Sequence, residues 1–264
     1  LPHQSPTGEV YVSERDVPMW RLGFERCDPV RDAFRICGGR PDSQPWPSRS
    51  SRRHVLKGLE LSREICDRAL EVTLGLKEGD NNNNNTHNNT NNNTNNNTHN
   101  NTHNNTHNNT HNNNKNKNSL SRPGDLSVLY AMLYNNDGNA EAYTRSNEIF
   151  SKTDGTRLNV KEHVDPSLFV LEPYPADVAG LQVYDGKFLR WVTCDGEGSE
   201  VEKEVGEGFG AMILFTGKAF HAAYEKRKKS QDVTINPTLH RVICHDEVRH
   251  ALIYEQKYVK FFDV

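Results

Sequence analysis

The sequence lacks several patterns that mark well-known classes of protein. Its five cysteines are scattered and form no Cys-x-x-Cys pair, which argues against a disulfide scaffold or a structural zinc site and favours a reducing compartment. No segment approaches the roughly 18 consecutive apolar residues of a transmembrane helix. A glycine-rich phosphate loop and a nucleophile elbow are both missing, so nucleotide-binding and serine-hydrolase functions have no support.

Charge is also close to balanced. The net charge of −3 predicts neither a nucleic-acid nor a membrane partner. One short basic run, residues 226–229, is interpreted as an exposed loop between two strands. No signal peptide is visible, and we expect a cytoplasmic protein. The chain begins with Leu1 rather than Met, so we expect its N-terminal part to be truncated.

A low-complexity segment divides the chain. Residues 81–118 are almost entirely Asn, Thr and His, and they lower the hydrophobic fraction to 34%. Histidines recur four apart in this tract, and on a helix they would share one face and could hold a metal. Asn is a poor helix former, however, and the tract has no apolar face to bury. We therefore predict a disordered insertion over residues 80–119, which a loop tolerates at low cost.

The regions on either side of the insertion have different patterns. Residues 1–79 contain proline-rich loops and an amphipathic stretch, 53–76, whose apolar spacing predicts a helix that ends near Gly75 or Gly79. Residues 120–264 contain short β-prone runs separated by Gly, Pro, Asn and Asp, which predicts a sandwich or barrel. The expected strands are 127–134, 167–172, 180–184, 187–194, 211–215, 240–244 and 251–258. We expect a mainly β protein with flanking helices.

A histidine and a carboxylate stand two residues apart at the start of this β region. On an extended strand His163 and Asp165 would point to the same side. One further histidine, for which His240 is the candidate, would complete a two-His-one-carboxylate triad that leaves open positions on Fe(II). Arg249 follows nine residues after His240 and suits an anionic cosubstrate, because arginine binds carboxylates bidentately. His221 lies between the two histidines but lacks the Arg-Val continuation that follows His240.

Five motifs in a fixed order resemble the Fe(II)/2-oxoglutarate oxygenase superfamily, specifically its isopenicillin N synthase-like branch. The resemblance covers roughly residues 120–260, and the order of the motifs is more specific than any one of them. The motifs are His163-Val164-Asp165, Gly180-Leu181-Gln182-Val183, Trp191-Val192, the glycine-flanked apolar run 210–217, and Pro237-Thr238-Leu239-His240-Arg241-Val242.

The resemblance implies a double-stranded β-helix, or jelly roll, with residues 120–264 as its catalytic core. It implies Fe(II) held by His163, Asp165 and His240, with Arg249 and Asn159 binding the 2-oxoglutarate cosubstrate. The implied reaction uses O₂ to hydroxylate or desaturate a small organic substrate. The substrate-facing residues are not identifiable from the sequence, because such positions vary freely in loops.

Two departures from the family pattern leave alternatives open. Where the family has Arg-x-Ser, this chain has Arg249-His250-Ala251, so one hydroxyl that would contact the cosubstrate is missing. The family's Asn-x-Tyr-Pro stretch is reduced to Leu158-Asn159-Val160. An oxidase that uses no 2-oxoglutarate and an inactive family member that acts as a binding module are therefore retained as alternatives.

Overall fold

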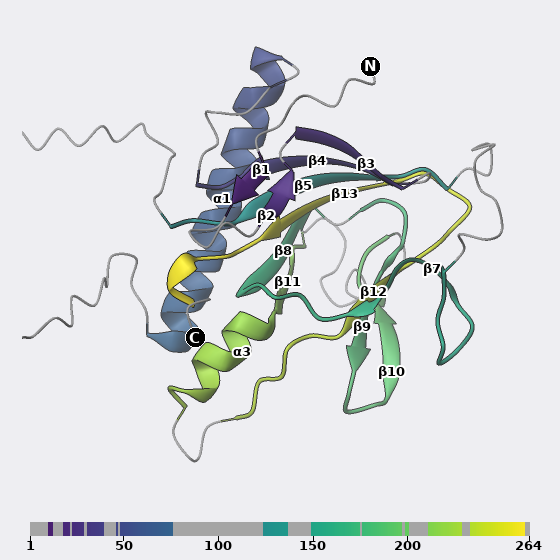
Figure 1. The fold of residues 1–264 in the computed structure, drawn as a ribbon. Helices are drawn as coiled ribbons and strands as arrows, with labels where there is room; N and C mark the ends of the chain where they lie inside the picture. Colours follow the sequence, from purple (N-terminus) through teal and green to yellow (C-terminus); the bar gives the residue numbers. More distant parts are fainter. Residues whose placement is uncertain are drawn as a thin grey trace, which may run out of the picture.

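The structure is a computed structural model. Over the residues that it describes the chain is mainly β, with its strands in antiparallel sheets and two α-helices packed outside them (Figure 1). It describes residues 10–12, 18–21, 23–28, 31–39, 46, 48–75, 124–136, 149–174, 176–196, 199–200, 211–228 and 233–261. The insertion predicted at residues 80–119 lies outside these ranges. The mainly β prediction is confirmed, and the antiparallel arrangement is consistent with a jelly roll.

The larger sheet has six strands and carries one wall of the site. Its order is β11 (Ile213–Thr216), β8 (Phe169–Tyr174), β13 (Arg249–Glu255), β5 (Val128–Tyr134), β4 (Arg31–Cys37) and β3 (Gly23–Asp28). β4 pairs with β5 in continuous register from Arg31 opposite Tyr134 to Cys37 opposite Val128. Residues from both sides of the Asn-rich tract therefore build this sheet.

The second sheet has five strands and carries the facing wall. Its order is β10 (Arg190–Thr193), β9 (Leu181–Asp185), β12 (His240–Ile243), β7 (Arg157–His163) and β6 (Ile149–Phe150). β12 lies between β9 and β7 and is antiparallel to both. A separate two-stranded pair is formed by β1 (Val10–Val12) and β2 (Pro18–Arg21).

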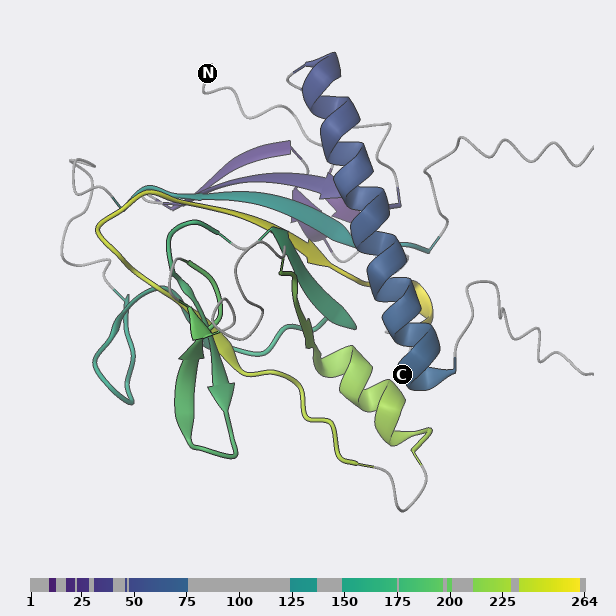
Figure 2. The same ribbon diagram turned by 180° about the vertical axis from the view of Figure 1, so that it is seen from behind.

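The long helix α1 (Arg49–Leu74) lies across the outer face of the six-stranded sheet (Figure 2). It begins four residues before the predicted start, because Ser48 and Ser51 form a reciprocal capping box. It ends at Gly75, whose φ of 64° is in the left-handed region that glycine adopts without strain. Its apolar face buries Leu59 and Cys66 in the main core.

A second helix, α3 (Lys218–Glu225), contacts α1 and was not predicted. The basic run begins at its C-terminal end rather than directly between two strands, so that part of the prediction was wrong. Lys226 and Arg227 are exposed as expected, while Lys229 lies outside the described residues. A short 3₁₀ helix, η3 (Val259–Phe261), follows β13. Within the described ranges, neither helix is long and apolar enough to span a bilayer.

A buried ion pair fixes α1 against the sheet. The Arg63 Nη2 atom lies 2.7 Å from the Gly38 carbonyl oxygen and 3.2 Å from Asp125 Oδ2. Asp125 Oδ1 accepts a hydrogen bond of 2.8 Å from the Ser127 N–H at the start of β5. The side chains of Arg63 and Asp125 are almost fully buried, so neither charge has ready access to water. Loss of either partner would leave the other charge buried without its opposite charge.

We therefore predict that Arg63→Ala lowers the free energy of unfolding by about 3–5 kcal/mol, because it leaves the Asp125 carboxylate buried without this positive charge. Chemical denaturation followed by circular dichroism measures the change. The matched control is Arg68→Ala on the same helix, whose pair with Glu71 is exposed and should contribute less than about 1 kcal/mol. Equal losses in the two variants would contradict the anchoring role of Arg63.

Candidate metal and cosubstrate site

Two strands from distant parts of the sequence bring the candidate histidines together. β12 pairs with β7 so that His240 lies directly opposite His163. The next pair joins Val242 to Val160, so three steps along β7 match two along β12. This extra residue is a β-bulge, a feature that turns a side chain to the other face of a strand. It explains why Val160 and His163, three residues apart, both face the same cavity.

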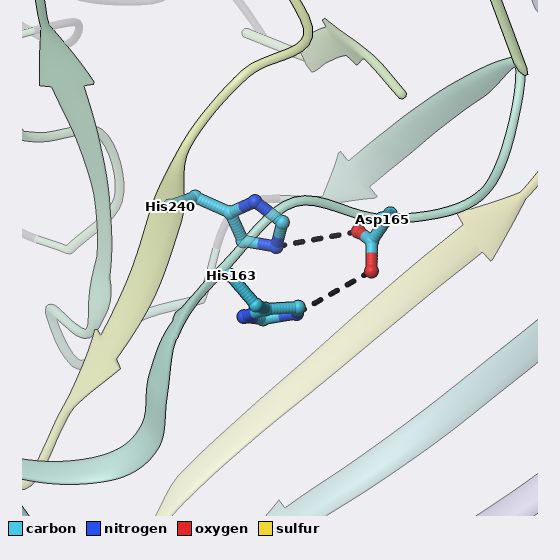
Figure 3. Close-up of side chains that lie close together, drawn as sticks. All are labelled: His163, Asp165 and His240. Carbon is cyan, nitrogen blue, oxygen red and sulfur yellow. Dashed lines mark ion pairs between the residues drawn. The ribbon is translucent and has the colours of Figure 1, made fainter. Parts of the chain in front are cut away.

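The carboxylate comes from the loop that follows β7. The two oxygens of Asp165 contact one histidine each: Oδ1 lies 3.3 Å from His163 Nε2 and Oδ2 lies 3.3 Å from His240 Nε2 (Figure 3). The centroids of the two imidazole rings are 4.2 Å apart. The three candidate ligand atoms all lie within 4.8 Å of one another, and this group is the only such cluster found among the described residues.

Backbone carbonyls orient both imidazoles. His163 Nδ1 lies 2.9 Å from the carbonyl oxygen of Lys161, and His240 Nδ1 lies 3.2 Å from that of Thr238. A carbonyl oxygen only accepts hydrogen bonds, so each Nδ1 donates to its carbonyl and each Nε2 is left facing Asp165, where it could bind a metal. Metal-binding histidines are oriented by a hydrogen bond of this kind at the nitrogen that does not bind the metal. The donor set and its orientation fit a divalent metal such as Fe(II).

The pKa directions of this group reflect its mutual attraction. Burial favours the neutral form of Asp165, but hydrogen bonds and charge from the two histidines outweigh it and lower the pKa of Asp165. Burial likewise opposes the charged form of His163, yet the hydrogen bond and charge of Asp165 raise its pKa overall. A partly buried anion with two adjacent imidazoles is an arrangement that a cation would stabilise further.

The three residues line a cavity of about 460 Å³ between the two sheets. This volume is within the range of sites for small organic ligands. Both sheets contribute to its walls, and the polar lining is concentrated on the six-stranded sheet. The residues other than the candidate ligands are Glu25, Cys27, Arg31, Arg35, Tyr130, Met132, Tyr134, Val160, Pro166, Val170, Glu172, Leu181, Phe215, Val242, Arg249, Ile253 and Glu255.

Arg249 lies in this cavity between two buried carboxyl groups. Its Nη2 atom is 3.2 Å from Glu172 Oε1 and also donates to Asp195 Oδ2, while its Nε donates to the Val178 carbonyl oxygen at 3.2 Å. Its guanidinium carbon lies 5.2 Å from the centroid of the Tyr134 ring. Asp195 also accepts from two backbone N–H groups, which makes it the better-compensated counter-ion of the two.

Glu172 is the less compensated carboxyl group of this cluster. Burial raises the pKa of Glu172 to about 8; the neighbouring Arg249 lowers it and Asp195 raises it. The single positive charge of Arg249 balances only one negative charge, and Asp195 already accepts hydrogen bonds from Arg249 and from the backbone. Glu172 is therefore mainly protonated at neutral pH.

The other predicted site residues have different surroundings. Asn159 is buried on β7, donates to the Ile243 carbonyl oxygen at 3.4 Å, and does not line the cavity. His221 lies on α3 with its Nδ1 2.8 Å from the Ile235 carbonyl oxygen, apart from the metal-ligand group. Ala251 is buried in a small apolar cluster with Tyr134 and Val242.

Sequence reasoning missed the polar residues that the N-terminal strands and β8 contribute. Arg31 and Arg35 stand four apart on β4 and both face the cavity, as the two-residue period of a strand allows. Glu172 interrupts an otherwise apolar strand. A charged residue in such a run was the one available signal, because buried carboxyl groups usually have a specific partner.

Comparisons with known proteins identify the fold. No protein-family model and no curated protein matches the sequence. Among the solved structures that match are two with a TM-score of 0.50. A provisionally named oxygenase from Shewanella oneidensis is 14% identical, and the match covers 97% of this chain and 72% of that one. The auxin dioxygenase of Arabidopsis thaliana, solved with 2-oxoglutarate, is 12% identical, with coverage of 90% and 67%. The chain thus shares the fold of these oxygenases, and the resemblance drawn from the five motifs is confirmed at that level.

We predict that Asp165→Ala weakens Fe(II) binding about 100-fold or more, because the two imidazoles that remain as ligands carry no negative charge. Anaerobic isothermal titration calorimetry measures this affinity. His221→Ala is the matched control, since it removes a histidine outside the group and should leave the affinity unchanged. Weaker Fe(II) binding by His221→Ala, with unchanged binding by Asp165→Ala, would overturn the assignment of the ligands.

A second prediction concerns stability and pH. Between about pH 5 and pH 8 folded Glu172 still holds a proton that the unfolded chain has released, so its contribution to stability falls as pH rises through this window. Glu172→Gln should remove that part of the decline. Urea unfolding at several pH values measures it, with the exposed Glu60→Gln as control. Parallel curves for the wild type and Glu172→Gln would contradict the assigned protonation state.

Proposed function

We propose that the protein is a non-heme Fe(II)-dependent oxygenase of the isopenicillin N synthase-like branch, with a jelly-roll core. It would oxidise a small organic substrate with O₂ and 2-oxoglutarate, by hydroxylation or desaturation. The observation that carries the proposal is the convergence of His163, Asp165 and His240 at the wall of a cavity between the sheets.

The three residues would be the protein ligands of the iron, and a set of three leaves positions for exchangeable ligands. When bound, Fe(II) activates O₂, and 2-oxoglutarate supplies two electrons as it decarboxylates to succinate and CO₂. For hydroxylation the balance is substrate, O₂ and 2-oxoglutarate to hydroxylated substrate, succinate and CO₂. The protein contributes the orientation of the ligands and a partly enclosed cavity that limits access of water.

Arg249 supports the choice of a dicarboxylate cosubstrate. Arg249 is a buried cation that lines the cavity, and a hydrogen bond from arginine to a carboxylate is strengthened by the opposite charges. Asn159, predicted as a second cosubstrate contact, has a weaker case because it lies outside the cavity lining.

The part of the cavity lined by the N-terminal strands suits the organic substrate. The hairpin of β3 and β4 supplies Glu25 and Arg35 to this lining, and β5 supplies Tyr130. Tyr130 donates to Glu255 Oε2 at 2.9 Å, and its ring lies 5.8 Å from the guanidinium carbon of Arg35. Such a mixture of aromatic and charged groups favours a small polar substrate with an apolar portion.

We predict that the Fe(II)-loaded protein forms succinate from 2-oxoglutarate, with matching O₂ consumption, even slowly without its organic substrate. His240→Ala should lower succinate formation to background, whereas His221→Ala should retain it. Succinate is quantified by mass spectrometry and O₂ with an electrode.

The same assay separates the alternatives. Substrate-dependent O₂ consumption without succinate would support an oxidase that needs no 2-oxoglutarate. A chain that does not bind Fe(II) would support an inactive family member that acts as a binding module.

A further inference from the structure

Two residues that line the cavity each have a buried polar side-chain atom without a hydrogen-bond partner. Within the described part of the chain, neither Arg249 Nη1 nor Glu172 Oε2 has a hydrogen-bond partner. Both residues are only 2% exposed, so water does not readily compensate either atom. Orphaned buried groups are uncommon and costly, and their presence in a cavity wall indicates a place for a polar ligand.

The two residues are held in fixed positions beside each other. Arg249 Nη2 contacts Glu172 Oε1 at 3.2 Å, and Arg249 is held from behind by Asp195 and the Val178 carbonyl oxygen. A Cβ atom at Gly180 would lie 2.5 Å from Arg249 Nε, so the chain passes this guanidinium too closely for any other side chain. Arg249 is therefore positioned before a ligand arrives, which reduces the entropy cost of binding.

Ala251 leaves no hydroxyl group beside Arg249 on β13. It is two residues from Arg249 on β13 and therefore faces the same side, yet it offers no hydrogen-bonding group. Its neighbours are apolar. Glu172, on the adjacent strand β8, is the polar group beside Arg249 that faces the cavity.

The charge of the cluster determines which ligand it can accept. With Glu172 and Asp195 both ionised, two negative charges would surround one positive charge, and a further carboxylate would be repelled. With Glu172 neutral, Arg249 and Asp195 cancel, and two hydrogen-bond donors, Nη1–H and Oε2–H, are available to one anion. Hydrogen bonds to a charged acceptor are stronger than those between neutral groups.

We propose that Glu172 acts as a neutral carboxylic acid that, together with Arg249 Nη1, binds the distal carboxylate of a 2-oxo dicarboxylate. This inference rests on the proposed function, since it identifies the ligand as 2-oxoglutarate. Glu172 supplies the donor that Ala251 lacks, and ionisation of Glu172 expels the ligand.

Several titratable groups surround Glu172. Arg249 comes from β13, Asp195 follows β10, and Tyr134 faces it from β5. Cys194 is the other titratable group, and burial raises the pKa of this thiol to about 11. Burial also raises the pKa of Tyr134, so neither of these two ionises near pH 8. Between pH 7 and 9, Glu172 is the group of this cluster whose charge changes.

The test measures binding of 2-oxoglutarate to the Mn(II)-loaded full chain by isothermal titration calorimetry between pH 6.5 and 9.5, without O₂. Above about pH 8 the wild-type affinity should fall about tenfold per pH unit, because each binding event takes up one proton. Glu172→Gln keeps an N–H donor and should remove this dependence. Glu172→Leu should bind about tenfold more weakly at pH 7, with no such dependence.

A second ligand tests whether the pH dependence comes from Glu172 or from the metal. 2-Oxobutyrate keeps the 2-oxo acid but lacks the distal carboxylate, so its affinity should not show the decline above pH 8. The same decline for 2-oxobutyrate would place the titration at the metal and overturn the inference. Proton uptake at pH 9, obtained from buffers of different ionisation enthalpy, should be close to one for wild-type 2-oxoglutarate binding. Proton uptake near zero in the wild type would by itself overturn the inference.

The failure of the inference is distinguishable from that of the proposed function. If 2-oxoglutarate binds with the same pH profile in the wild type and in Glu172→Gln, the role of Glu172 is refuted while the function stands. If neither ligand binds to the Mn(II)-loaded protein at pH 7, both are refuted.

Discussion

The pairing of β7 with β12 is the constraint on which the site depends. Two strands far apart in the sequence place His163 opposite His240, and a bulge in β7 directs His163 into the cavity. A shift of the register by one residue would turn one histidine to the other face of the sheet. β9 pairs with the other edge of β12, so the register is fixed from both sides. The carboxylate of Asp165 then needs only a short loop to reach both imidazoles.

Arg241 strengthens this pairing from the outer side. Its guanidinium lies 4.1 Å from the centroid of the Trp191 ring and contacts Asp154 Oδ2 at 2.7 Å. Its Nε donates to Gln182 Oε1 at 2.8 Å. Arg241 therefore ties β12 to β9, β10 and the loop before β7. The arginine that follows His240 in the motif thus has a structural role that does not involve a bound ligand.

Local patterns in the sequence predicted the parts of the fold that depend on local chemistry. Helix α1 and most strands after residue 120 followed from apolar spacing and turn residues, and His163, Asp165 and His240 followed from a spaced motif. The bulge in β7 could not be predicted, because it arises from the register with β12. β3 and β4 were missed because each becomes a stable strand only when β5 completes the sheet, across the Asn-rich tract. Glu172 and Arg249 are 77 residues apart, and nothing in either segment indicates the other.

The two ends of the cavity differ in how the fold controls them. At the histidine end, backbone carbonyls of Lys161 and Thr238 fix the imidazoles, so geometry determines which ligand fits. At the Arg249 end the geometry is equally fixed, but two carboxyl groups compete for one cation. Whether Glu172 competes with Asp195 for Arg249 depends on whether Glu172 carries a proton. The affinity for an anionic ligand that contacts both groups would therefore depend on the charge of Glu172.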